Sequence, residues 1–143
     1  MFSSPALWPS RQADVKLFAM KDILWISLGG IIGANLRFGV NRLAAKYLSA
    51  SVPYGTLIVN VTGSFVLGFF LVWTTERVLA DPLWRALVAV GFCGAYTTFS
   101  SFSYETFRLF EEGHHGLAFA NFAANNLASF AAVVAGAVVA RSL

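Results

Sequence analysis

Polar side chains recur at helical spacing in the last apolar stretch of the chain. Asn121, Asn125 and Ser129 are separated by four residues each, so a helix would stack them along one face. Because a polar stripe is expensive to expose to lipid, this face must contact protein or line a pore. Two interpretations stay open, namely hydrogen bonds that fasten neighbouring helices and a polar path for an ion.

A second polar group surrounds two phenylalanines in the stretch GFCGAYTTFSSFSYETF, which covers residues 91–107. Gly91 and Gly94 lie beside the pair Thr97 and Thr98, and each glycine weakens a helix by roughly 1 kcal/mol relative to alanine, which predicts a break near 94–98. Carbonyls freed by a break cannot stay unsatisfied in lipid. Carbonyls from two facing subunits can hold a hard cation, which prefers oxygen ligands.

The first apolar stretch contains glycines and an arginine. Gly29 and Gly33 form a small-xxx-small pair, which predicts close contact with another helix. Residues 23–36 are too few to span a membrane alone, so Arg37 must extend to the interface or face protein and water. An interfacial anchor and a cationic vestibule that collects an anion both fit this position.

The composition shows which elements must position these residues. Of 143 residues, 57% are hydrophobic and only 12% are charged, whereas roughly a quarter of residues are charged in soluble domains. This excludes a water-soluble globule. Asp, Glu, Lys and Arg are missing from three long stretches, between Lys46 and Glu76, between Arg85 and Glu105, and between Glu112 and Arg141. Each is long enough to cross a bilayer as a helix, which takes about 20 residues.

We therefore predict an all-α integral membrane protein with four transmembrane helices. Their approximate bounds are 23–47, 56–75, 83–110 (broken near 94–98) and 116–140. Residues 1–20 form an N-terminal tail, and residues 21–143 form one four-helix transmembrane domain. We expect a multi-pass protein of the inner (plasma) membrane.

The basic residues bear on orientation. With the tail set aside and the N-terminus placed on one side, the two sides hold Lys21, Arg77, Arg85 and Arg141 against Arg37, Arg42, Lys46 and Arg108. An excess of Lys and Arg normally fixes the cytoplasmic side. The even division predicts dual topology, with two copies pairing as an antiparallel homodimer about a twofold axis in the membrane plane.

Four pieces of the sequence resemble the small fluoride channels of the Fluc/CrcB family. They are GGIIGANLRF in the first span, YGTLIVN in the second, GFCGAYTTFSSFS followed by YE in the third, and the polar fourth helix. The resemblance covers about residues 23–140 and implies a passive fluoride-selective channel that exports cytoplasmic fluoride. It also implies a dual-topology homodimer with two pores and a structural sodium ion at its centre. It implies no enzymatic activity and no nucleic-acid partner.

The resemblance assigns roles to individual residues of this chain. The main-chain carbonyls of Gly94 and Thr97 would hold the sodium ion, and Arg37 would lie near the vestibule. The pore and fluoride-binding residues would be Asn60, Thr98, Phe99, Phe102, Asn125 and Ser129. This chain departs from the family pattern in Ala95-Tyr96 and in a fourth helix unusually rich in asparagine.

These residue types suit a fluoride pore. Fluoride is small and strongly hydrated, so a channel must replace its water with donors, such as the two amide N–H groups of Asn60 and several hydroxyls. Phe99 and Phe102 lie on nearly one helix face, and an aromatic ring has a positive edge. Several modest donors also allow release, which conduction requires.

The alternative function is a proton-coupled small multidrug exporter, which is also a four-span antiparallel dimer. Its chemistry requires an acidic residue deep in the membrane, and Glu105 is the only candidate. A structural role for Glu105 fits better. A purely structural subunit is a third possibility, although it should tolerate loss of Asn60 or of the phenylalanine pair. The lone Cys93 is expected to be a small buried side chain.

Overall fold

The structure, a computed structural model, describes residues 20–48, 52–76 and 81–143. The predicted N-terminal tail, except for Met20, and Arg77 lie outside these ranges. The described elements, in chain order, are α1 (Met20–Tyr47), α2 (Tyr54–Glu76), α3 (Pro82–Arg85), the π-helix η1 (Ala86–Cys93), α4 (Gly94–Tyr96), α5 (Phe99–Glu111) and α6 (His115–Ser142).

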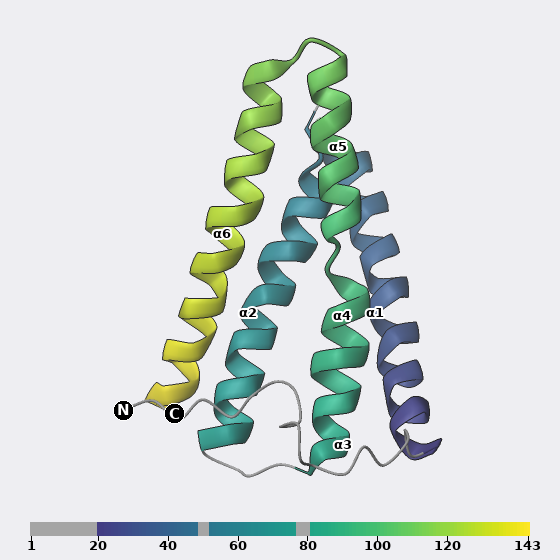
Figure 1. Cartoon of the computed structure of the whole chain (residues 1–143), viewed down its shortest axis with the longest axis vertical. Helices are drawn as coiled ribbons and strands as arrows, with labels where there is room; N and C mark the ends of the chain where they lie inside the picture. Colours follow the sequence, from purple (N-terminus) through teal and green to yellow (C-terminus); the bar gives the residue numbers. More distant parts are fainter. Residues whose placement is uncertain (1–19, 49–51, 77–80) are drawn as a thin grey trace, which may run out of the picture.

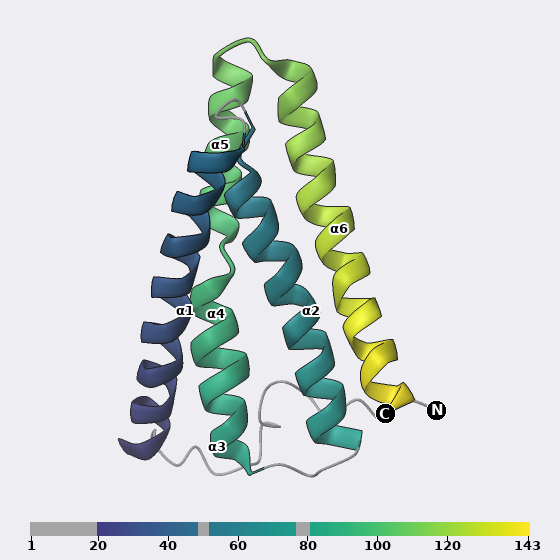
Figure 2. The same cartoon turned by 180° about the vertical axis from the view of Figure 1, so that it is seen from behind.

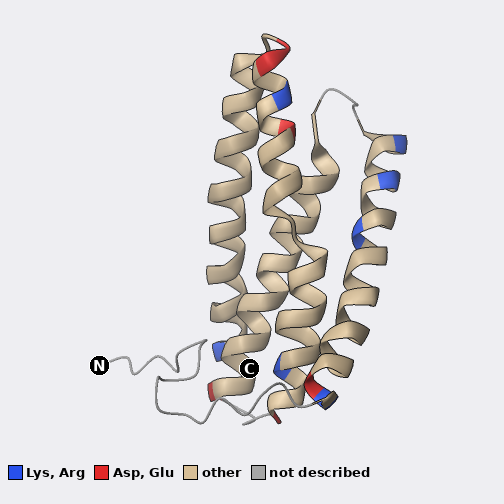
Figure 3. Cartoon of the chain, turned by 45° about the vertical axis from the view of Figure 1, so that its right-hand side comes forward, with Lys and Arg blue, Asp and Glu red and all other residues tan. Residues whose placement is uncertain are grey.

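These elements form four spans. Each of α1, α2, the run Pro82–Glu111 and α6 is long and apolar enough to cross a membrane. The prediction of an all-α membrane protein with four transmembrane helices is confirmed, and the chain is a multi-pass membrane protein. Figure 3 shows that most charged residues lie near the two ends of the spans, and that one basic residue lies partway along the helix at the right of the view.

The spans run alternately up and down (Figure 1), so the start of α1 and the end of α6 lie at the same end of the molecule. The helix α2 packs along α6, and α1 packs against η1 and α4. The view from behind in Figure 2 shows α2 between α6 and the third span. At the other end, Gly113 adopts a positive φ of 80°, which lets the chain turn sharply from α5 into α6.

Glycines set how closely the spans approach. A Cβ atom at Gly29 would collide with the main-chain carbonyl of Leu87, and one at Gly33 would collide with that of Phe92. The close contact predicted from the Gly29/Gly33 pair is therefore confirmed, and its partner is η1. Gly68 of α2 meets the Val133 carbonyl of α6 in the same way. Backbone thus packs directly on backbone at both contacts.

The third span is interrupted between α4 and α5. Thr97 and Thr98 are extended, with φ and ψ of −79° and 158° at Thr97 and −151° and 114° at Thr98. Thr98 then caps α5, because its Oγ1 accepts a hydrogen bond from the Ser101 N–H at 3.1 Å. The ribbon between α4 and α5 in Figure 1 shows this interruption.

The sequence predicts that the glycines break the helix, but the structure places the interruption at Thr97 and Thr98. Gly94 keeps helical dihedral angles, with φ −62° and ψ −34°. Gly91 lies inside η1, where a Cβ would stand 2.6 Å from the Ile26 carbonyl, so its small size serves packing against α1. The helix leaves its path only at Thr97 and Thr98, where α2 supplies other hydrogen-bond partners.

Candidate functional site

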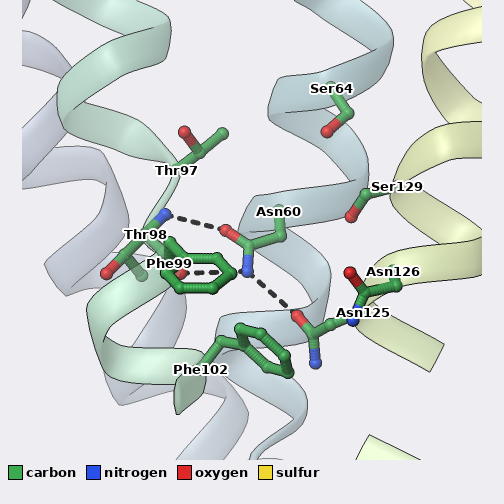
Figure 4. Close-up of a pocket in the computed structure, with 9 residues that line it drawn as sticks. All are labelled: Asn60, Ser64, Thr97, Thr98, Phe99, Phe102, Asn125, Asn126 and Ser129. Carbon is green, nitrogen blue, oxygen red and sulfur yellow. Dashed lines mark hydrogen bonds between the residues drawn. The ribbon is translucent and has the colours of Figure 1, made fainter. Parts of the chain in front are cut away.

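A pocket of about 250 Å³ lies beside the interruption, between α2, α5 and α6. Figure 4 shows the residues around it, with the polar side chains of α2 and α6 facing the extended segment. Its lining residues are Asn60, Ser64, Thr97, Thr98, Phe99, Phe102, Asn125, Asn126 and Ser129. The structure therefore brings together all six of the residues that the sequence assigned to a pore.

Asn60 forms hydrogen bonds to the main chain where the third span is interrupted. Its Oδ1 accepts the Thr98 N–H at 2.8 Å, and its Nδ2 donates to the Thr98 carbonyl at 3.1 Å. The buried side chain thus pairs with both main-chain groups of Thr98, which would otherwise be unsatisfied in lipid. Sequence reasoning considered Asn60 only as a pore donor and missed this role. The sequence showed an asparagine in the second span and a predicted break in the third, but no local pattern that paired them.

The second N–H of Asn60 begins a chain of side-chain hydrogen bonds, which we call the amide relay. Asn60 Nδ2 donates to Asn125 Oδ1 at 2.9 Å, and Asn125 Nδ2 donates to Asn121 Oδ1 at 3.0 Å. Asn121 Nδ2 then donates to Thr106 Oγ1 at 2.8 Å, and the Thr106 hydroxyl donates to the Phe102 carbonyl at 2.8 Å. Asn121 and Asn125 therefore fasten α6 to α2 and α5.

Ser129 behaves differently from the asparagines on its stripe. Its Oγ is buried and has no hydrogen-bond partner among the described residues, yet it lines the pocket. Thr98, by contrast, uses its hydroxyl to cap α5 and to contact Ser101 Oγ at 3.0 Å. Ser129 is therefore the predicted pore residue whose hydroxyl is available to a bound species.

The phenylalanine pair lies at the edge of the pocket. The ring centroids of Phe99 and Phe102 are 5.4 Å apart with an interplanar angle of 67°, so one ring presents its edge to the other. Phe102 is buried with 3% of its surface exposed and also contacts Phe122, whereas Phe99 is 77% exposed. The pair thus leads from the interior of the chain to its outer surface.

The predicted sodium ligands, Gly94 and Thr97, lie at the end of α4. In a continuous helix the Gly94 carbonyl would accept from the Thr98 N–H, and the Thr97 carbonyl would accept from the Ser101 N–H. Here the Thr98 N–H goes to Asn60 Oδ1 and the Ser101 N–H goes to Thr98 Oγ1. Both carbonyls thus lose their regular helical donors, which suits oxygen ligands for a hard cation.

Two predicted charged residues lie away from this pocket. Arg37 is half-buried on α1 and is not among the pocket's lining residues. Glu105 lines a second cavity of about 350 Å³ near the start of α2, and its Oε1 accepts a hydrogen bond from Thr56 Oγ1 at 2.7 Å. Its Oε2 is buried without a partner among the described residues. Glu105 therefore links α5 to α2 near one end of the bundle.

Comparison with known proteins places the chain in a family. The profile described as "CrcB-like protein, Camphor Resistance (CrcB)" matches residues 24–137. A protein of Koribacter versatilis named fluoride-specific ion channel FluC is 54% identical over 125 residues, which cover 87% of this chain and 99% of the relative.

Two further relatives carry the same name. The protein of Sulfurihydrogenibium sp. is 49% identical over 124 residues, which cover 87% of this chain and all of the relative. That of Dehalococcoides mccartyi is 44% identical over 118 residues, covering 82% of this chain and 91% of the relative. The profile match over residues 24–137 includes the interrupted third span, the residues of the pocket beside it and most of all four membrane helices. This chain therefore belongs to the CrcB-like family.

Proposed function

We propose that this chain forms a passive, fluoride-selective ion channel of the plasma membrane that exports cytoplasmic fluoride. The observation that carries the proposal is the pocket beside the interruption. There the Ser129 hydroxyl has no partner within the described part of the chain and adjoins a phenylalanine pair. The relatives named as fluoride-specific channels support the choice of anion.

The pocket suits a small, strongly hydrated anion that must lose water to pass. The Ser129 hydroxyl supplies a hydrogen-bond donor, and the positive edges of Phe99 and Phe102 continue the path to the surface. These contacts are individually modest, so the anion is stabilised without being trapped. The two phenylalanine rings make entry costly for an anion that fits the donors poorly. Export then follows the electrochemical gradient of fluoride.

A sodium ion is proposed to bind the main-chain carbonyls of Gly94 and Thr97 from two copies of the chain. The support is chemical, because both carbonyls are oxygen donors that have lost their regular helical partners at the interruption. Within the described residues, no group of His, Cys, Asp and Glu forms an alternative metal site. The bound ion would add a positive charge near the anion path and join the two copies.

The two copies are proposed to pair as an antiparallel homodimer with dual topology. The even division of basic residues between the two membrane sides supports insertion in both orientations. Phe99 supports pairing, because a second copy would cover a pore residue that one copy leaves 77% exposed. Arg37 is proposed to attract the anion at the vestibule, since it is a half-buried cation in a membrane helix.

The function is tested by fluoride efflux from liposomes that contain the purified protein. A fluoride electrode should record rapid release once the membrane potential is relieved, with little release of chloride from matched vesicles. Equal chloride and fluoride flux, or no fluoride flux from correctly reconstituted protein, would refute the channel. An imposed pH gradient distinguishes the alternative function, a proton-coupled multidrug exporter, because that protein would move protons in exchange for an organic cation.

A further inference from the structure

The amide relay has a direction. From Asn60 through Asn125 and Asn121 to Thr106, every side-chain donor faces the next member, and the hydroxyl of Thr106 ends the relay on the Phe102 carbonyl. The Asn125 amide therefore turns its oxygen toward Asn60 and its Nδ2 away, as Figure 4 shows. At a pocket proposed to bind an anion, this orientation withholds an N–H donor.

The members of the relay differ in how firmly they are held. Asn60 cannot rotate its amide without losing both bonds to the main chain of Thr98, where its Oδ1 accepts at 2.8 Å and its Nδ2 donates at 3.1 Å. Asn125 and Asn121 are held through other side chains, apart from one bond from Asn125 Nδ2 to the Asn121 carbonyl at 3.1 Å. The Thr106 hydroxyl rotates freely between donors and acceptors.

We propose, on the basis of the proposed function, that Asn121 and Thr106 are positioning residues that let the Asn125 amide rotate when fluoride enters the pocket. In the rotated state the Thr106 hydroxyl donates to Asn121 Oδ1, and Asn121 Nδ2 donates to Asn125 Oδ1. The Nδ2 of Asn125 then converges with the free N–H of Asn60 on the anion. The pocket thus gains two amide donors in place of one hydrogen bond between them.

The count of hydrogen bonds explains why the anion controls this rotation. The observed state has five bonds among these groups, including the one to the Asn121 carbonyl. The rotated state replaces them with two bonds of the opposite direction, from Thr106 to Asn121 and from Asn121 to Asn125. It adds two from Asn60 and Asn125 to the anion, which are charge-assisted and about twice as strong as neutral ones. Without an anion the rotated state has fewer hydrogen bonds than the observed state and is therefore disfavoured. Occupancy of the pocket by the anion and orientation of the Asn125 amide are thus coupled.

The substitution Asn121→Asp tests this coupling. A carboxylate has no N–H group, so it accepts from both Asn125 Nδ2 and the Thr106 hydroxyl and holds Asn125 in its observed orientation. We expect the fluoride concentration that gives half-maximal efflux to rise by about tenfold or more, the effect of losing one hydrogen bond to a charged group.

The matched control is Asn126→Asp, which adds the same charge at the pocket without touching the relay. Asn126 lines the pocket, and its Nδ2 donates to the Phe122 carbonyl of its own helix. A purely electrostatic effect would raise the half-maximal concentration at least as much in Asn126→Asp as in Asn121→Asp. That result, with normal wild-type flux, would overturn the amide rotation alone, whereas absence of wild-type fluoride flux would overturn the proposed function.

Amide NMR provides a measurement that does not depend on flux. In fluoride-free wild-type protein, the Asn125 Nδ2 protons should show through-space contacts to Asn121, and saturating fluoride should replace these with contacts to the Asn60 Nδ2 protons. Chloride at the same concentration should leave the original contacts. Retention of the Asn121 contacts in saturating fluoride would overturn the proposal, including in the case where Asn121→Asp does not fold.

Discussion

Replacing Asn60 by alanine should destabilise the protein by about 3–6 kcal/mol. The structure gives this side chain two bonds to the main chain of Thr98 and one to Asn125. A buried donor or acceptor left unsatisfied costs about 1–3 kcal/mol, so the two Thr98 groups account for about 2–6 kcal/mol. The lost bond between side chains adds about 0.6 kcal/mol, the average measured in membranes.

The assay is reversible unfolding of the purified protein in detergent micelles, with the free energy of unfolding compared between wild type and variants. The matched control is Asn126→Ala, which removes an exposed amide whose bond stays within α6, and it should change stability by less than about 0.5 kcal/mol. A loss below about 1 kcal/mol in Asn60→Ala would refute the idea that this side chain satisfies the interrupted main chain.

Asn60→Asp separates acceptance from donation. The aspartate keeps an oxygen for the Thr98 N–H but, when ionised, has no donor for the Thr98 carbonyl or for Asn125. We therefore expect the Asn60→Asp protein to be destabilised as well, since its carboxylate would face the Thr98 carbonyl oxygen and Asn125 Oδ1. Stability equal to wild type would show that the two donated bonds contribute nothing.

Four further outcomes follow from the site and the packing. Ser129→Ala should leave stability unchanged or slightly raised, because no residue that the structure describes bonds to this hydroxyl, while the fluoride concentration for half-maximal efflux rises about tenfold. Equal half-maximal concentrations in the two proteins would exclude Ser129 from the path. Phe102→Ile should slow fluoride efflux up to about tenfold with dimers intact on size-exclusion chromatography, since a ring edge is lost, and wild-type flux would remove the assigned pore. Gly33→Val should lower stability by about 1–3 kcal/mol, because its side chain meets the Phe92 carbonyl. Gly30→Val should not, because no atom of the described residues outside its own helix lies within 4 Å of a Cβ there; unfolding in detergent compares the two. Replacing sodium by potassium should weaken pairing of copies and fluoride flux, and unchanged pairing on dilution would argue against a central ion at Gly94 and Thr97.

The membrane spans could be predicted from the sequence because hydrophobicity is a property of single residues. Long stretches of hydrophobic residues without charges therefore mark the spans directly. The contact of Gly29 and Gly33 was predictable for a similar reason, since small residues at helical spacing permit close approach whatever the partner. The partner itself, η1, could not be predicted, because it depends on how the third span folds.

The interruption shows where such reasoning stops. The sequence predicted a break near 94–98 from two glycines beside a pair of threonines. Gly94 keeps helical dihedral angles, and the interruption lies at the threonines. Asn60 is 38 positions away from Thr98 in sequence, and a hydrogen bond over that separation leaves no local pattern. The stripe on α6 likewise allowed two interpretations. The structure shows that Asn121 and Asn125 fasten helices, whereas Ser129 lines the pocket, so the ion path stays a prediction.

The pairing of Asn60 with Thr98 also has a consequence for the order of assembly in a cell. Both main-chain groups of Thr98 find their partners within the same chain, so a newly inserted copy carries no unpaired peptide at that residue while it diffuses in the bilayer. Completion of the fold and the proposed pairing with a second copy would thus be separate events. The carbonyls of Gly94 and Thr97, which lack their regular helical donors, would be left for the proposed pairing to satisfy, and biogenesis would then have two stages.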